Sequence, residues 1–366
     1  MSSSESVPAV RAGVDLLSKT AELVAVASES FSEADITALI QNELQNHQHL
    51  ELTRVGDNLV ARTQLGRSVR VVLAGHTDTV PANGNSQARV NGDCLWGVGS
   101  ADMKGGLAVM LKLAERHRAP AVDVTYVFYA REEVASEHSG LGELFELRPD
   151  LLQGDVALLG EPTDGQIEAG CQGAMRFLIT LKGKRAHTAR AWMGSNAIHR
   201  LSGLLSAIDQ YQPRQPILLG CHFHEALQVV RVAGGVAGNV VPDSAEIELA
   251  HRFAPDRTAA QAQAHVLDLL QPHLADADEV EVLDISPAAY PAVDHPCIRA
   301  LIQRHDLAVR GKLGWTDVAR FAEHGVPAVN FGPGDAAVAH TAEEHVAQDS
   351  ILRTYLALDD LLTDGP

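Results

Sequence analysis

The 366-residue sequence is poor in cysteine, and none of its cysteines stand in the close pairs typical of metal-binding or redox motifs. Cys94, Cys171, Cys221 and Cys297 are widely separated, which favours a reduced, cytoplasmic setting over a disulfide-linked, secreted one. No window holds 18 uncharged apolar residues, so we expect no membrane span. The first ten residues, "MSSSESVPAV", lack the basic start and the apolar core of a secretory signal.

Positive charge is also scarce. Lys and Arg number 29 against 47 Asp and Glu, which gives a formal net charge of −18. An acidic chain repels nucleic acid and anionic membrane surfaces, and no run of Lys or Arg creates a local exception. These classes of partner are therefore excluded. The net charge does not restrict small substrates, because a local pocket can oppose the overall sign.

The length of the chain suggests two domains. In the first part of the sequence, apolar runs of strand length alternate with segments of helical apolar spacing, which predicts an α/β layer with a mixed, mostly parallel sheet. We expect helices at 13–27, 34–47 and 103–117, and strands at 59–63, 69–75, 124–130 and 155–161. The helix at 295–305 and the strand at 327–334 are expected to return to this domain.

The middle of the chain has a different pattern. Segments there predict the order β-α-β-β-α-β, which is typical of a ferredoxin-like α+β unit. We therefore expect a discontinuous catalytic domain at 1–175 and 287–366, with an inserted domain at 176–286.

Chemically useful side chains follow the predicted strands. In "VVLAGHTDTV", His76 and Asp78 are two residues apart, so they face the same side of an extended chain. They stand at the carboxyl end of a strand, where ligands bind in open α/β sheets. The alternative is that both are solvated loop residues.

The same pattern recurs along the chain. Asp102 occurs in a glycine-rich turn before a helix, Glu132 and Glu133 follow a strand, and Glu161 follows another; His340 comes late, in "AHTAEEH". Any one of these carboxylates could be an ordinary surface group. Together, imidazoles and carboxylates form the ligand set of a zinc-type site.

Five motifs occur in a characteristic order: "GHTDTVP", "GVGSADMKGG", "REE", "GEPT" and "AHTAEEH". This ordered set resembles the dinuclear zinc peptidase and deacylase family, and the resemblance extends along essentially the whole chain. It implies two Zn²⁺ per subunit, which Co²⁺ can replace. One ion would be held by His76, Asp102 and Glu161, and the other by Asp102, Glu133 and His340, with Asp102 bridging.

The resemblance also implies roles for other residues. Asp78 would accept the ring N–H of His76 and orient it, and Glu132 would be the general base. His187 of the inserted domain would stabilise the oxyanion in the active site of a partner subunit, within a homodimer formed by the inserted domains. A surface histidine on a turn is the alternative for His187. The peptide bond between Asp102 and Met103 is expected to be cis.

Further segments, including "GCQGAMRFLI", "VAGNVVPD" and "GWTDVARFAEHGVPAVNFGPGD", resemble family members that hydrolyse N-succinyl-LL-2,6-diaminopimelate for lysine and cell-wall precursor synthesis. This implies that Arg252 and Asn239 bind substrate carboxylates. An arginine of the better-known enzymes is replaced by the turn "GCQG", and Arg176 is the nearest substitute. Deacetylation of acetylornithine, an aminoacylase activity and a catalytically silent metal- or peptide-binding relative stay open as alternatives.

Overall fold

The computed structural model of the protein describes residues 7–366, with side chains from Asp15 onward. The predictions made for residues 1–6 lie outside the described part. The chain divides into two compact units. The first comprises the chain up to Ala169 together with Ala292–Arg310 and Arg320–Pro366, and the second comprises Gly170–Pro291 and Gly311–Ala319. Within residues 7–366, every helix is too short or too polar to cross a bilayer.

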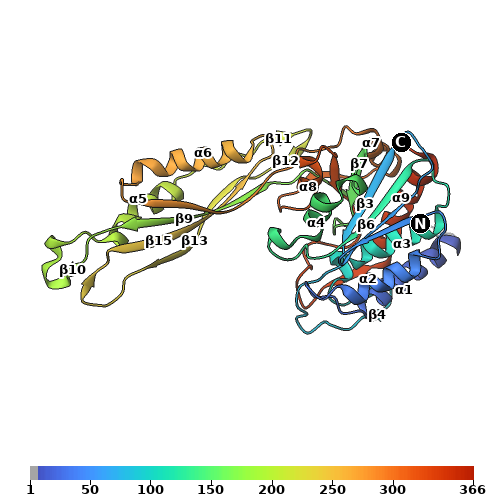
Figure 1. The fold of residues 1–366 in the computed structure, drawn as a ribbon, viewed down its shortest axis with the longest axis horizontal. Coiled ribbons are helices and arrows are strands. Elements are labelled where there is room, and N and C mark those ends of the chain that lie inside the picture. The colour runs from blue at the N-terminus through green and yellow to red at the C-terminus, as the bar shows by residue number, and fades with distance from the viewer. Residues whose placement is uncertain (1–6) are drawn as a thin grey trace, which may run out of the picture. The chain divides into compact units, whose positions relative to one another are not determined.

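The first unit is built on a mixed sheet, as the sequence predicted (Figure 1). Its four central strands, β6, β3, β7 and β18, are parallel, and antiparallel strands flank them. Among the described residues the strand order is β1 (Glu51–Val55), β2 (Asn58–Arg62), β6 (Asp123–Tyr129), β3 (Arg70–His76), β7 (Val156–Leu159), β18 (Ala328–Asn330), β8 (Ile167–Ala169) and β17 (Val309–Gly311).

The central strands are buried along almost their whole length because both faces of the sheet are covered. All residues of β6 are buried, as are all residues of β3 after Arg70. The helices that accompany the sheet are α1 (Val7–Val24), α2 (Ala34–Leu44), α3 (Gly105–Arg116), α4 (Gly140–Leu147), α7 (Pro296–His305), α8 (Val318–Glu323) and α9 (Gln348–Asp364). Helices α1, α3 and α9 pack on one another, and α3 lies against β3 and β6.

Glycine allows α3 to begin very close to the sheet. A Cβ atom at Gly106 would lie 2.4 Å from the carbonyl oxygen of Gly160, just after β7. No larger residue fits this approach without moving the backbone. The "GG" of the "DMKGG" motif therefore brings the start of α3, and with it Asp102, to the carboxyl edge of the sheet.

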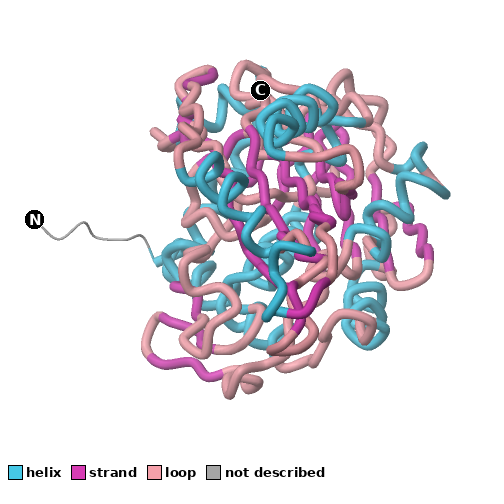
Figure 2. Tube along the Cα trace, turned by 90° about the vertical axis from the view of Figure 1, so that its left-hand side faces the viewer, coloured by secondary structure: helices cyan, strands magenta, loops and turns pink. Residues whose placement is uncertain are grey.

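A small antiparallel sheet connects distant parts of the sequence. It has the order β19 (His345–Ala347), β5 (Cys94–Trp96) and β4 (Arg89–Asn91). His345 pairs with Trp96, and their rings stack with centroids 4.4 Å apart. The pairing places the segment that follows His340 beside the segment that leads to Asp102. Loops and turns, drawn in pink in Figure 2, make up much of the trace.

The second unit has the predicted order of elements, β9 (Gly173–Lys182), α5 (Ala197–Asp209), β13 (Ala226–Gly234), β15 (Ser244–Phe253), α6 (Ala259–Leu270) and β16 (Glu279–Ser286). The strands form an antiparallel sheet in the order β13-β15-β9-β16. Short strand pairs extend the unit: β10 (Ala186–His187) with β14 (Val240–Val241), and β11 (Ile217–Leu218) with β12 (Cys221–His222).

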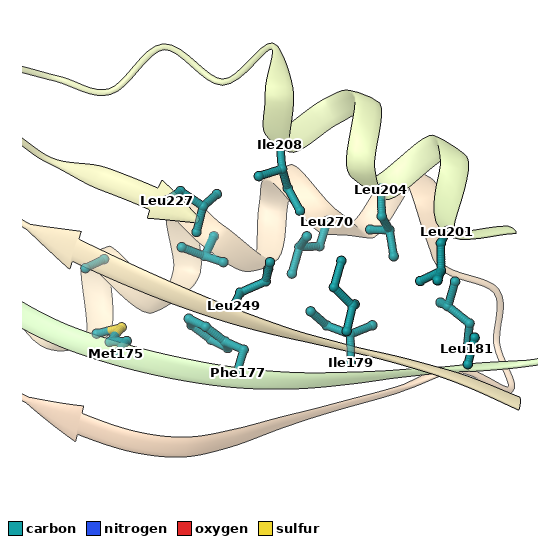
Figure 3. Close-up of a cluster of buried hydrophobic side chains, with 14 of the residues drawn as sticks. Met175, Phe177, Ile179, Leu181, Leu201, Leu204, Ile208, Leu227, Leu249 and Leu270 are labelled. Carbon is teal, nitrogen blue, oxygen red and sulfur yellow. The ribbon is translucent and has the colours of Figure 1, made fainter. Parts of the chain in front are cut away.

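One face of this sheet carries the core of the unit. Alternate residues of β9 and β15 are buried, as expected for a sheet covered on one side. Figure 3 shows Leu204 and Ile208 of α5 pointing toward Phe177, Ile179 and Leu249 of the strands. The opposite face carries the polar residues of the alternation.

The packing of this core predicts that two neighbouring leucines differ greatly in their contribution to stability. Leu204 is fully buried, whereas Leu205 is 38% exposed on the same helix. Because Leu204→Ala leaves a cavity, we expect it to lower the free energy of unfolding by about 2–5 kcal/mol. Urea unfolding of Leu205→Ala is the control, with an expected loss under about 1 kcal/mol. Equal losses in the two variants would contradict the packing described here.

Candidate active site

The site lies at the carboxyl edge of the parallel strands of the first unit. His76 is the last residue of β3, and β6 and β7 lie on either side of that strand. In the register of β3 with β7, Ala74 pairs with Leu159. His76 lies two residues after Ala74, and Glu161 lies two residues after Leu159, so both reach the same edge of the sheet. Glu133 follows the end of β6 by four residues. Parallel pairing thus explains why residues far apart in sequence share one edge.

Asp102 lies between two histidines. Its Oδ1 is 3.0 Å from Nε2 of His76, and its Oδ2 is 3.4 Å from Nε2 of His340. Nε2 of His340 is also 2.7 Å from Oε1 of Glu133. Possible ligand atoms of His76, Asp102 and Glu133 all lie within 4.8 Å of one another. The two oxygens of Asp102 therefore face the two halves of a single cluster.

Charge pairing within this cluster shifts the pKa values of His76, His340 and Asp102. Burial lowers the pKa of His76, but hydrogen bonds and charges from Asp102 and Asp78 outweigh it and raise the pKa well above its usual value. Hydrogen bonds to Asp102 and Glu133 raise the pKa of His340 to about 10. For Asp102, burial opposes ionisation, yet the two histidines hold its pKa well below the usual range.

Asp78 is fully buried and has several donors. Nδ1 of His76 is 3.1 Å from the backbone carbonyl oxygen of Asp78 and 3.5 Å from its Oδ1, so the closer contact is to the backbone. The carboxylate accepts backbone N–H groups from Glu132, at 3.0 Å, and Glu133, at 3.1 Å. Ser30 donates its hydroxyl to Oδ2 at 2.7 Å. Burial works against ionisation, but these groups and His76 lower the pKa of Asp78 to about 2.

Sequence reasoning missed Glu344, although it belongs to the "AHTAEEH" motif. Its side chain is buried, and Oε1 accepts the backbone N–H groups of Ala101 and Asp102, both at 3.1 Å. Burial raises the pKa of Glu344, and these N–H groups oppose the shift. The signal in the sequence was an acidic residue four positions after His340. Glu344 therefore holds the backbone of the residue that lies between the histidines.

Lys104 is a second residue that the sequence did not single out. It is buried, and Nζ donates to the carbonyl oxygen of Val26 at 2.8 Å. Burial lowers its pKa to about 8, and the charges of Glu344 and Asp78 oppose this shift. A cation at this position offsets part of the repulsion among the carboxylates.

The donor set fits divalent metal ions. Two imidazoles and several carboxylates converge, and carboxylates this close repel one another unless cations lie among them. The peptide bond between Asp102 and Met103 is cis, as the resemblance implied. Glu161 is buried just after β7, at the same edge, and Glu132 is half-buried next to Glu133.

The remaining predicted residues lie in the second unit. His187 is exposed and pairs with Val240, and the carbonyl oxygen of Asn239 accepts the N–H of Thr188 at 3.0 Å. His187 and Asn239 therefore lie at one end of this unit, where Ser244 begins β15. Figure 1 shows β10 at this end and β11 and β12 at the other.

Arg252 is near the opposite end of β15. The ten residues of that strand span roughly 30 Å, which is longer than a substrate with two or three small carboxylate groups. Within one chain, Arg252 and Asn239 therefore lie near opposite ends of the second unit. Arg176 shares the open face of the sheet with Arg252, but it is paired with Glu248 at 2.6 Å.

The chain is similar to known proteins along most of its length. The model of peptidase family M20/M25/M40 matches residues 72–364. The chain is 39% identical to a succinyl-diaminopimelate desuccinylase of Corynebacterium glutamicum, over 97% of this chain and 99% of that protein. It is 46% identical to a candidate succinyl-diaminopimelate desuccinylase of Mycobacterium tuberculosis, over 93% and 98% of the two chains.

Solved structures share the fold at low sequence identity. A tripeptidase from Staphylococcus aureus has a TM-score of 0.78 and 22% identity, covering 96% of this chain and 97% of that one. A metallo-carboxypeptidase from Sulfolobus solfataricus has a TM-score of 0.73 and 15% identity, with 95% and 98% covered. At these identities the likeness establishes the fold alone.

The pKa shifts predict that metal binding weakens as the pH falls. Without metal, the pKa of His76 is raised well above its usual value and that of His340 to about 10, so a metal ion competes with protons for both rings. We expect the apparent affinity for Zn²⁺ to fall by up to about 100-fold per pH unit when two protons are displaced. Calorimetric titration in buffers of different ionisation enthalpy measures the released protons.

His340→Gln should release about one proton fewer per bound cluster than the unchanged protein. His345→Gln, in the same part of the chain but stacked on Trp96, is the matched control. Metal affinity that is independent of pH between 6 and 8 would contradict the proposed ligands.

Proposed function

Since this chain belongs to peptidase family M20/M25/M40, we propose that it hydrolyses the amide bond of N-succinyl-LL-2,6-diaminopimelate, giving succinate and LL-2,6-diaminopimelate. The observation that carries a hydrolytic site is Asp102, whose two oxygens face His76 and His340 with Glu133 beside them. The substrate follows from relatives of that name, which match nearly the whole chain. We also propose a cytoplasmic location, which the free state of all four cysteines supports.

The proposed cofactor is a pair of Zn²⁺ ions, which Co²⁺ can replace. His76, Asp102 and Glu161 would hold one ion, and Asp102, Glu133 and His340 the other. When bound, such ions activate water and polarise a carbonyl group. Glu344 supports this ligand set by fixing the backbone of Asp102.

Glu132 is the proposed general base. It removes a proton from the attacking water, whose oxygen forms a bond to the succinyl carbonyl carbon. The C–N bond then breaks, and Glu132 returns the proton to the departing amine. The backbone contact from Glu132 to Asp78 supports this role because it orients the residue beside the ligands.

His187 is the proposed donor to the oxyanion. Its Nδ1 accepts the backbone N–H of Ala189 at 3.0 Å. In a neutral ring, an acceptor at Nδ1 places the proton on Nε2. The exposed ring then presents an N–H donor of the kind that stabilises a tetrahedral oxyanion.

Arg252 and Asn239 are the proposed contacts to the substrate carboxylates. Among the side chains that the structure describes, from Asp15 onward, none forms a hydrogen bond or ion pair with the guanidinium of Arg252, and its partners across the sheet are the small residues Ala226 and Ala174. This cation is available to an anion in a protein whose net charge is −18. Arg176 is a weaker candidate because Glu248 already pairs with it.

A homodimer formed through the second units is part of the proposal. Arg252 and Asn239 of one chain are too far apart to bind the same small molecule, whereas two chains can supply one residue each. Strand β13 lies at an edge of its sheet and exposes Val230 and Val232. Pairing β13 with the same strand of a second copy, across a two-fold axis, would cover the open edges of both sheets.

The central test is the release of succinate from N-succinyl-LL-2,6-diaminopimelate by zinc-loaded protein, compared with acetate release from N-acetylornithine. Glu132→Gln should keep its metal content and lose about 10²- to 10⁴-fold in kcat. Glu137→Gln, at an exposed residue of the short helical turn Ser136–His138, is the control. Near-normal turnover by Glu132→Gln would rule this residue out as the base, and equal kcat/KM for the two substrates would reject the succinyl assignment.

Removing Arg252 should erase most of the preference for the succinyl substrate. Because a bidentate contact to a carboxylate is lost, Arg252→Ala should cost about 2–5 kcal/mol in kcat/KM for that substrate. Arg231→Ala removes an exposed cation from the neighbouring strand and should change kcat/KM little. A similar loss in both variants would indicate a general charge effect.

Mixing His187→Ala with Glu132→Gln subunits tests delivery across the dimer. In a hybrid dimer, one site combines intact Glu132 with intact His187 from the partner. With random exchange, about a quarter of wild-type activity should return. An inactive mixture in which mass spectrometry detects hybrid dimers would contradict delivery in trans.

A further inference from the structure

The segment Ser28–Glu33, between α1 and α2, contacts the strand ends that carry the site. Ser28 donates its hydroxyl to the carbonyl oxygen of Thr77 at 2.7 Å. The N–H of Ser30 donates to the carbonyl oxygen of Thr79, and the N–H of Thr79 donates to that of Ser28. This segment therefore follows the chain on either side of Asp78 closely.

Glu33 ends this segment and is fully buried. Its Oε1 accepts the backbone N–H of Phe31 at 3.0 Å and that of Arg131 at 3.2 Å. Arg131 precedes Glu132 in the chain, so the second contact joins this segment to the loop of the proposed base. Arg131 also has a positive φ of 60°, a backbone conformation that residues other than glycine rarely adopt.

Two buried carboxylates thus accept the backbone N–H groups of three consecutive residues. Glu33 accepts the N–H of Arg131, and Asp78 accepts those of Glu132 and Glu133. Hydrogen bonds from N–H groups to ionised carboxylates are stronger than bonds between neutral groups. Every backbone donor from Arg131 to Glu133 is therefore fixed just where the chain presents its two adjacent glutamates.

Helix capping does not explain the buried carboxylate. Glu33 stands at the start of α2, but its side chain makes no capping hydrogen bond to that helix. Removing a carboxylate from water is costly, and burial accordingly raises the pKa of Glu33. Its hydrogen bonds go to the loop backbone at Phe31 and Arg131, so its contribution is to the shape of that loop.

We propose that Glu33 is a positioning residue for Glu132: by holding the N–H of Arg131, it fixes the direction in which the next residue presents its carboxylate. This inference rests on the proposed role of Glu132 as the base. It assigns to Glu33 no contact with substrate or metal. A displacement of about 1 Å at a reacting group can reduce turnover by about 100-fold. Loss of the hydrogen bond to Arg131, one residue before Glu132, can therefore lower turnover.

The first experiment measures the contact itself. Amide hydrogen exchange of the peptide covering residues 130–134 should be faster in Glu33→Ala than in the unchanged protein, because the Arg131 N–H loses its acceptor. Glu33→Gln keeps a carbonyl oxygen and should exchange more slowly than Glu33→Ala. Glu29→Ala, an exposed glutamate of the same segment, is the matched control. Unchanged exchange in Glu33→Ala would overturn the proposal, whatever reaction the protein catalyses.

The second experiment measures turnover at equal metal content. We expect kcat to fall by about 10- to 100-fold in Glu33→Ala, with KM changing less. Glu33→Gln should restore kcat to within about threefold of the unchanged protein, since a neutral acceptor is weaker but present. Full kcat in Glu33→Ala would overturn the proposal while leaving the hydrolase in place.

A double-mutant cycle separates positioning from general damage. If Glu33 acts through Glu132, adding Glu33→Ala to Glu132→Gln should leave the residual kcat of Glu132→Gln within about twofold. A further loss equal to that caused by Glu33→Ala alone would overturn the proposal. If the unchanged protein cleaves neither the succinyl nor the acetyl substrate, the proposed function fails, and the exchange experiment still decides whether Glu33 orders the loop.

Discussion

Buried carboxylates that accept backbone N–H groups are the interaction on which the site depends. Asp78 accepts the N–H groups of Glu132 and Glu133, and Glu344 accepts those of Ala101 and Asp102. The loops after the strands have no regular ladder to satisfy these donors, so a carboxylate provides the acceptor. Because each acceptor is itself buried and fixed, the ligand-bearing residues are held by the fold before any ligand binds.

This arrangement concentrates negative charge. Asp102 and Glu344 are close enough for each to influence the other, and His340 lies between Asp102 and Glu133. Without metal, protons on the histidines neutralise part of this charge, which is why their pKa values are raised. Divalent cations at the same position would replace those protons. A single electrostatic requirement therefore accounts for both the pKa shifts and the ligand set.

The sequence predicted the parts of the site that depend on local pattern. Continuous apolar runs identified β3, β6 and β7, and the rule that ligands bind at carboxyl ends singled out His76 and Glu133. The alternation of polar and apolar residues likewise predicted the order of elements around β9 and β15. These predictions depend only on neighbouring residues, so no long-range information was needed.

Long-range pairing could not be predicted in this way. The contact of β19 with β5, which brings His340 to Asp102, joins segments some 250 residues apart, and its short strands carry little pattern of their own. The resemblance supplied that connection. The sequence analysis missed helix α9. It also missed the roles of Glu33 and Glu344, because a buried acidic residue that bonds to backbone looks like a surface residue in sequence. The separation of Arg252 from Asn239 along β15 became evident only from the register of the sheet.

A crystal structure of the zinc-loaded protein, with anomalous scattering recorded at the zinc edge, would locate the metal ions and their ligands. We expect two ions about 3.5–4 Å apart, with one oxygen of Asp102 on each. His76 and Glu161 would complete one site, and Glu133 and His340 the other, while Asp78 and Glu344 would keep their backbone N–H contacts and bind no metal. A single ion, or metal bound directly by Asp78 or Glu344, would contradict the proposed two-metal site.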